Sequence, residues 1–179
     1  MLAAATRIVA TDGIQALTHR AVAAAIGVPH ARVVYHFTSV ADLRQATLLQ
    51  AGHRIVDHLA DLIDGNPDPA QVPALAAELA VGVVTVLRDE TVTLYALMAQ
   101  ATRDQNLRPA VDEVNARIAD LIEPLSGDRS LASMAAAALL GVVLVAMAEG
   151  GDADPEELRA QVTGLVTHFD PHDQMRDRR

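Results

Sequence analysis

One stretch limits what this chain can fold into more than any other. From Leu131 to Ala148 the sequence reads "LASMAAAALLGVVLVAMA", eighteen residues without a charged side chain. Eighteen apolar residues are the lower limit for a membrane span, but the stretch lacks the aromatic belts and flanking basic clusters that are typical of one. We interpret it as a helix buried at a subunit interface and expect no membrane association, with an intramolecular core helix as the alternative.

The other apolar side chains are also small. Apolar residues make up 51% of the 179 residues and aromatic residues only 2%, a composition that suits helices packed closely on one another. Nothing in the sequence predicts a strand. There is no cysteine, which excludes disulfides and thiolate metal sites and fits a reducing compartment. No charged and then apolar leader opens the chain, so we expect a cytoplasmic protein.

The net charge of -9 is unevenly distributed. Residues 1–50 carry four arginines against two acids, a net charge of +2, whereas residues 51–179 carry ten arginines against 21 acids, a net charge of -11. A contact with a polyanion is therefore predicted only for the first fifty residues, because the rest of the chain would repel it.

Three short helices and a long fourth helix are predicted in the first 63 residues. Thr18 can cap the second helix, Gly27 ends that helix, and Pro29 suits the first turn of the third. Ser39 with Asp42 forms the capping box that opens the fourth helix.

The stretch "DGNPDPAQVP", residues 64–73, is the clearest break in the chain. Asp154 before a proline and two glutamates predicts the start of a last helix. The periodicity after the break predicts helices at residues 72–88, 91–105, 107–124, 130–149 and 155–169. The chain is thus predicted to be all-α, with about nine helices.

Two short helices that meet at a glycine-containing turn form a helix-turn-helix pattern. Val33 and Phe37 would face the core, which leaves the polar residues of 30–36 on the outer face. Such a face can enter the major groove of DNA. The pattern alone equally allows a solvated polar turn in an acidic helical bundle.

A longer run of motifs resembles a known family. From Leu2 to about Leu49 the chain resembles the amino-terminal domain of the TetR/AcrR family of transcriptional regulators: "DG" follows the first helix, "LTHRAVAAAIGV" spans the second helix and its turn, and "YHF" followed by "TSVADL" ends the third. The resemblance implies a three-helix DNA-binding head on a larger helical domain that binds a small ligand and dimerises. The expected domains are residues 1–46 for the head, 47–170 for the ligand-binding and dimerisation domain, and 171–179 for a frayed tail.

By position, the resemblance assigns DNA contacts to nine residues. Base reading is assigned to Arg20, His30, Ala31, Arg32 and Val34. Phosphate contacts are assigned to Thr18, Tyr35, His36 and Thr38. Arginine suits this role because its fork can bind O6 and N7 of guanine.

The sequence departs from the family pattern at two places. Val40 occupies a position where the family usually has a lysine, and no basic arm precedes the first helix. Both departures predict modest DNA affinity with a shallow salt dependence.

A small-molecule pocket and a dimer interface are expected in the second domain. The pocket candidates share one helical stripe, Thr91, Tyr95, Met98 and Thr102, with Arg103 nearby; the alternative is that they are core and loop residues. The scarcity of aromatic residues argues against a site that stacks flat polycyclic ligands. The interface candidates are apolar residues of the last two helices: Leu131, Leu139, Val143, Met147, Leu158, Val162, Leu165 and Phe169.

His53, Asp57 and Asp61 share a face of the long helix, and such a set can bind a metal. A solvated surface is the favoured interpretation, so we predict no metal, no cofactor and no enzyme.

The favoured hypothesis is a ligand-responsive repressor, a homodimer that binds palindromic double-stranded DNA and releases it when an effector shifts the helix at residues 39–63. The alternatives are a helical small-molecule-binding protein that has lost DNA binding and, more remotely, an enzyme that uses the His53 face.

Overall fold

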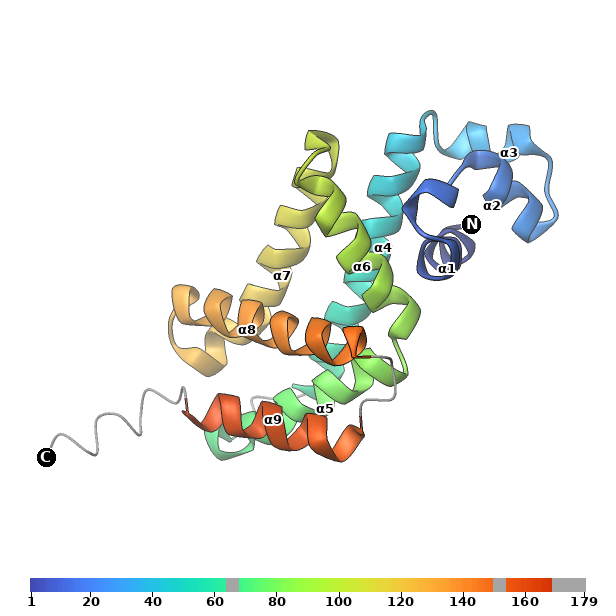
Figure 1. Cartoon of the computed structure of the whole chain (residues 1–179). Coiled ribbons are helices and arrows are strands. Elements are labelled where there is room, and N and C mark those ends of the chain that lie inside the picture. The colour runs from blue at the N-terminus through green and yellow to red at the C-terminus, as the bar shows by residue number, and fades with distance from the viewer. Residues whose placement is uncertain (64–67, 150–153, 169–179) are drawn as a thin grey trace, which may run out of the picture. The chain divides into compact units, whose positions relative to one another are not determined.

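A computed structural model describes residues 1–63, 68–149 and 154–168, and over these ranges every regular element is helical (Figure 1). This confirms the predicted all-α fold. The α-helices are α1 (Leu2–Asp12), α2 (His19–Ile26), α3 (His30–His36), α4 (Val40–Leu62), α5 (Val72–Thr85), α6 (Arg88–Ala101), α7 (Arg108–Ser126), α8 (Arg129–Ala148) and α9 (Pro155–His168).

The helices pack into two compact units. The first contains Met1–Asp57 with Leu87–Ile118, and the second contains the described residues of His58–Val86 and of the chain from Ala119 onward. The predicted head at residues 1–46 therefore packs together with α6 and the first part of α7, because α6 lies against α1.

The first unit has its core where α1, α2, α3 and the start of α4 meet. Seven aliphatic side chains form this head core, which we define as Ala5, Val9, Leu17, Val22, Ala23, Val33 and Leu43. All seven are buried, so the three short helices hold one another in place although none is long enough to be stable alone.

A glycine allows α4 and α7 to approach closely in the same unit. A Cβ atom built on Gly52 would lie 2.4 Å from Cγ2 and 2.8 Å from Cγ1 of Val114. No other residue type fits at this position without a shift of the valine.

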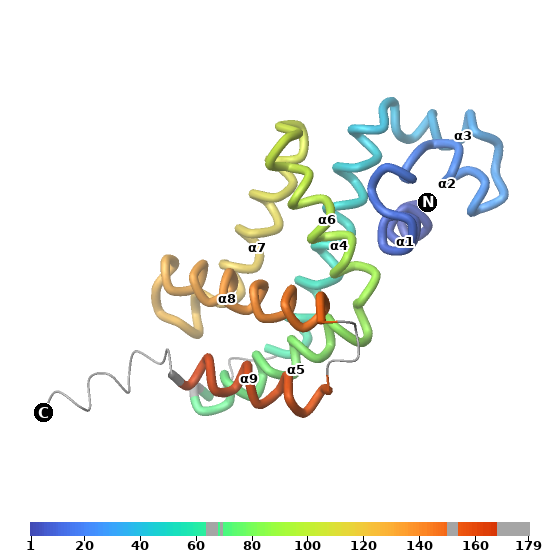
Figure 2. The backbone as a smooth tube through the Cα atoms, viewed as in Figure 1, coloured from blue at the N-terminus to red at the C-terminus, as the bar shows by residue number. Residues whose placement is uncertain are grey.

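The second unit is built on α5, half of whose residues are buried. Every residue from Leu79 to Val84 is buried, and α9 and α8 both pack against α5. Figure 2 shows the backbones of α5 and α9 side by side. Arg159 of α9 binds Glu78 of α5 with a 2.7 Å Nε–Oε1 distance, and this hydrogen bond lowers the pKa of Glu78.

Of the described helices, α8 is the one long and apolar enough to cross a membrane by length and composition. Only 17% of its most apolar stretch is buried by the described part of the chain, and its other residues are half-buried or exposed. Asp128 caps the helix by accepting hydrogen bonds from the amides of Ser130 and Leu131.

Candidate nucleic-acid interface

The turn between α2 and α3 has the geometry that its sequence predicts. The Thr18 hydroxyl oxygen accepts a hydrogen bond from the amide of Ala21 at 3.1 Å and caps α2. Gly27 ends the helix in the left-handed conformation, with φ of 67° and ψ of 34°, where a side chain would be strained. The amide of Val28 closes this end by donating to the Ala23 carbonyl at 3.0 Å.

The helix that follows the turn has one buried side and a solvent-facing side. Val33 is fully buried in the head core and Phe37 is half-buried against it. Tyr35, by contrast, is 84% exposed. The nine predicted DNA contacts are all exposed: Thr18, Arg20, His30, Ala31, Arg32, Val34, Tyr35, His36 and Thr38.

A histidine that the sequence does not single out lies beside this face. The ring of His19, at the first turn of α2, meets the ring of His30 edge-on, with 6.1 Å between the centroids. The Nε2 atom of His19 is buried and has no hydrogen-bond partner. The only sequence signal was its place between Thr18 and Arg20, two predicted contacts.

The capping box at the start of α4 is confirmed, and it engages one predicted phosphate contact. The amide of Asp42 donates to the Ser39 hydroxyl, and the amide of Ser39 donates to Oδ2 of Asp42, both at 3.0 Å. The Thr38 hydroxyl also donates to Oδ2 of Asp42. Thr38 must therefore give up this bond before it can donate to a phosphate.

The same hydrogen bonds hold Asp42 in its charged form. Those from the Thr38 and Ser39 hydroxyls lower the pKa of Asp42 below 3.8. A lowered pKa means that the cap stabilises the fold at neutral pH, and that this contribution disappears only as the pH falls through the lowered value.

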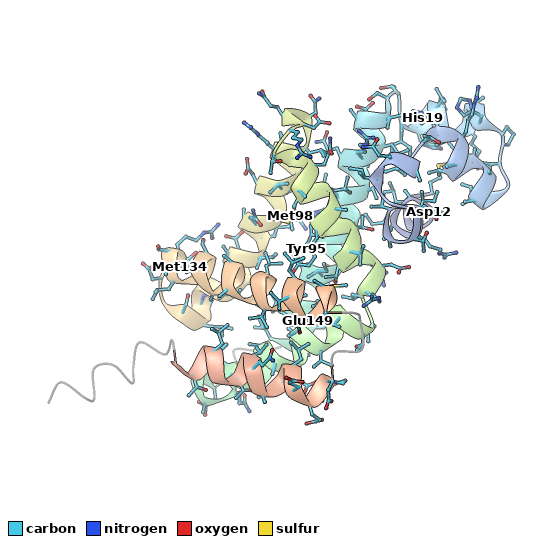
Figure 3. The ribbon with its side chains drawn as sticks, in the orientation of Figure 1. Asp12, His19, Tyr95, Met98, Met134 and Glu149 are labelled. Atoms are coloured by element: carbon cyan, nitrogen blue, oxygen red, sulfur yellow. The ribbon has the colours of Figure 1, made fainter. Side chains whose placement is uncertain are left out.

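The pocket candidates on α6 divide into a buried and an exposed group. Thr91 is buried and its hydroxyl donates to the Leu87 carbonyl at 2.8 Å. Tyr95 and Met98 are half-buried and are labelled on α6 in Figure 3. Thr102 and Arg103 are exposed where the helix ends. Their role in ligand binding stays a prediction.

One residue of the α4 face that was considered for a metal contacts a carboxylate of α7: Nε2 of His53 lies 3.1 Å from Oε1 of Glu113. The neighbouring Arg54 forms an ion pair with Glu90 on α6, with 2.8 Å between Nε and Oε1. Among the described residues, no group of three or more His, Asp or Glu side chains is arranged to hold a metal ion.

The predicted dimer-interface residues differ in how far the chain itself buries them. Val143, Leu158 and Val162 are buried inside the chain, where they fill the subunit core, and their assignment to a contact with a second chain stays a prediction. Leu139, Met147 and Leu165 are half-buried, Leu131 is exposed, and Phe169 lies outside the described residues.

The exposed side of α8 carries other apolar residues, which the sequence did not single out. Met134 is 61% and Val145 is 57% exposed, and Figure 3 labels Met134 on this helix. A Cβ atom built on Gly141 would meet nothing within 4 Å. We define the α8 outer face as Leu131, Met134, Gly141, Leu144 and Val145.

Comparisons with known proteins agree along both parts of the chain. Residues 1–47 match the family model described as "Bacterial regulatory proteins, tetR family", and residues 67–168 match the model "Tetracyclin repressor-like, C-terminal domain". A search of curated proteins gave no match.

Solved structures resemble the chain over nearly its whole length. The multidrug binding protein EbrR, complexed with imidazole, is 30% identical over 92% of this chain and 91% of its own, with a TM-score of 0.72. SCO1917 from Streptomyces coelicolor A3, a member of the TetR family, is 29% identical over 92% and 94%, with a TM-score of 0.78. SCO7518 from Streptomyces coelicolor A3(2), a candidate transcriptional regulator, is 22% identical over 95% of each chain, with a TM-score of 0.81, and supports the fold alone.

Proposed function

Because the chain belongs to the TetR family of transcriptional regulators, we propose that it is a repressor that releases a palindromic operator when a small molecule binds. Its amino-terminal domain binds DNA and its carboxy-terminal domain binds a ligand. We argue four parts of this proposal from the residues of the chain itself. They are the operator, the direction of regulation, the dimer and the effector.

The observation that carries the DNA-binding proposal is the outer side of α2 and α3. Arg20 and Arg32 are exposed there together with His30, in the part of the chain that has a positive net charge. Buried Val33 fixes which side of α3 faces outward. An arginine fork can bind guanine, and exposed Val34 can contact a thymine methyl group.

The α8 outer face supports a homodimer. Monomeric soluble proteins rarely leave a large contiguous apolar surface in water, and α8 has no charged residue after Arg129. We propose that a second copy of the chain covers this face through the same residues, as two-fold symmetry requires. A symmetric dimer presents two α3 helices, and its operator is then palindromic.

The buried polar groups bear on the chemistry of the effector. Complexes of EbrR with ethidium and with proflavin have been solved. In the described part of this chain the polar side chains that are buried as a whole are Thr6, Thr47, Thr91 and Thr93. Single buried polar atoms also lie on His19, Arg44, Gln50 and His58. Glu90 of α6, whose side chain is 18% exposed, is already paired with Arg54.

We therefore propose a mainly apolar effector with one or two hydrogen-bonding groups, and not a polycyclic cation. Such a molecule would act by binding better to the conformation that does not fit the operator. A regulator of this kind binds chromosomal DNA, which lies in the bacterial cytoplasm. We therefore propose a cytoplasmic location.

Selection of binding sites from a pool of random DNA duplexes tests the DNA-binding proposal. At low salt, we expect enrichment of a palindrome whose half-sites lie about one helical turn, roughly 34–36 Å, or a multiple of it apart. Failure to enrich any palindrome would favour the alternative, a helical binding protein with lost DNA binding. Val40 and the engaged hydroxyl of Thr38 are the features that favour this alternative.

A further inference from the structure

Three histidines lie in the head, and we name them the head histidines: His19, His30 and His36. His19 and His30 are the first residues of α2 and α3, and their rings meet edge-on. His36 is the last residue of α3, and its ring meets that of Tyr35 edge-on, with 5.4 Å between the centroids. All three therefore lie at the ends of the two helices whose outer side carries the predicted DNA contacts.

No partner within the described chain fixes the proton state of these three rings. Their nitrogens take part in none of the hydrogen bonds or ion pairs between described side chains. The Nε2 atom of His19 is buried without a partner, and His30 and His36 are exposed. His53 on α4 differs, because its Nε2 atom lies 3.1 Å from a carboxylate oxygen of Glu113.

The charged groups near the head histidines include no acid that pairs with them. The helices α1, α2 and α3 pack against one another. Besides the three rings, the charged or titratable groups here are the amino terminus, Arg7 and Asp12 on α1, Arg20 on α2, Arg32 and Tyr35 on α3, and Asp42 and Arg44 at the start of α4. Asp42 accepts hydrogen bonds from Thr38 and Ser39, and every ion pair between described residues lies after residue 52. A charge gained by a head histidine is thus not neutralised within the head.

A proton changes what a histidine can offer to DNA. Histidine gains its proton between about pH 8 and about pH 5. The neutral ring has one N–H donor and one acceptor, whereas the protonated ring has two donors. Phosphate oxygens and the O6 and N7 atoms of guanine are all acceptors, so DNA binds the protonated ring better than the neutral one.

The outer side of α2 and α3 has few other positive charges. Of the nine predicted DNA contacts, only Arg20 and Arg32 are permanently charged, and Val40 occupies the position of the expected lysine. The net charge of residues 1–50 rises from +2 to +5 when all three head histidines are protonated. Protons can therefore supply more positive charge to this surface than the fixed net charge does.

Two of the rings also lie close enough to repel each other when both are protonated. The centroids of His19 and His30 are 6.1 Å apart, and two positive charges at such a separation repel. A DNA phosphate beside them would offset this repulsion. Binding of DNA and binding of protons at this place therefore favour each other, because the coupling between two ligands is reciprocal.

We propose that DNA binding by this chain is coupled to proton uptake by the head histidines, so that its affinity for DNA rises as the pH falls from about 8 to about 5. The proposal rests on the proposed function for the contact with DNA itself. The DNA-bound chain holds more protons than the free chain, so a higher proton concentration favours the bound state. Occupancy of DNA then depends on pH as well as on the effector.

Binding of a fluorescently labelled duplex of random sequence tests the proposal. Fluorescence anisotropy measures the affinity of the full chain at about pH 5.5 and at about pH 7.5, in buffers of one low ionic strength. We expect an affinity about tenfold higher at the lower pH, the change that uptake of one proton across one pH unit produces.

Substitutions at the two exposed head histidines identify the groups that take up protons. The double variant His30→Gln with His36→Gln keeps polar side chains that cannot be protonated, and it should lose most of the pH dependence. His53→Gln on α4 is the matched control and should keep the pH dependence. Circular dichroism at both pH values shows whether each variant is folded.

Titration calorimetry of the unchanged chain with the same duplex, in two buffers of different ionisation enthalpy, counts the protons taken up. This measurement needs no substitution, and it decides the question if the double variant fails to fold: uptake of protons supports the proposal, and no uptake overturns it.

Equal affinity of the unchanged chain at both pH values also overturns the proposal, as does a pH dependence that persists in the folded double variant. Failure to select a palindromic operator does not affect these measurements, because a random duplex binds through its phosphate charge. Absence of duplex binding at every pH would overturn the DNA-binding proposal together with this one.

Discussion

At the scale of single residues, Arg32 is the side chain most suited to reading a base. It is exposed on α3, directly before buried Val33 and two residues before exposed Val34. We predict that Arg32→Ala lowers affinity for the selected operator by about 1–3 kcal/mol and affects scrambled DNA far less. Competition binding on the two duplexes measures the difference. Arg108→Ala, an exposed arginine of α7, is the control, and equal losses on both duplexes would contradict the assignment.

Val40 is the residue at which a charge is expected and absent. It is half-buried at the start of α4, where a lysine side chain could extend to solvent. We predict that Val40→Lys strengthens DNA binding and increases the magnitude of the salt-dependence slope by about 0.9, the value for one added phosphate contact. Binding titrations at several salt concentrations give the slope. The same charge change at exposed Val86, Val86→Lys, should leave the slope nearly constant; an equal change in both variants would argue for a nonspecific charge effect.

At the scale of elements, the approach of α4 to α7 depends on Gly52. We predict that Gly52→Ala destabilises the protein by about 1–3 kcal/mol, because the new methyl group overlaps Val114. Denaturant unfolding measures this change. Gly164→Ala on α9 is the control, because its Cβ atom meets nothing and alanine favours a helix by up to about 1 kcal/mol.

A double mutant separates overlap from other effects of Gly52→Ala. Val114→Ala removes the atoms that the new methyl group would meet, so the double mutant should be less destabilised than the sum of the two single changes. If the two changes in the free energy of unfolding simply add, the close approach of α4 and α7 is not the cause of the destabilisation by Gly52→Ala.

The sequence predicts where helices begin and end better than it predicts which side of each helix is buried. Thr18, Gly27 and the Ser39–Asp42 pair are local signals, and each one ends or begins a helix as expected. In α8 nearly every side chain is apolar or small, so periodicity could not tell buried Val143 from exposed Val145. The hydrogen bond that the Thr93 hydroxyl of α6 donates to the Thr6 carbonyl of α1 was equally out of reach, because only the folded chain brings α6 to α1.

At the scale of the whole molecule, the α8 outer face should decide the oligomeric state. We predict that Val145→Asp yields a monomer with weakened operator binding, because it places a charge in the proposed interface. Light scattering coupled to size-exclusion chromatography measures the mass. Val86→Asp is the matched control, since Val86 is 75% exposed on the segment after α5. A dimer that persists in Val145→Asp would place the interface elsewhere.

The first unit is assembled from two separate parts of the chain, Met1–Asp57 and Leu87–Ile118. During synthesis, the first part leaves the ribosome before α6 exists, so α1 lacks the partner that Thr93 and Ala96 provide. Contacts between distant segments form late because closing the intervening loop costs entropy. A nascent chain therefore gains the contacts of α6 with α1 only after about the first hundred residues have been made.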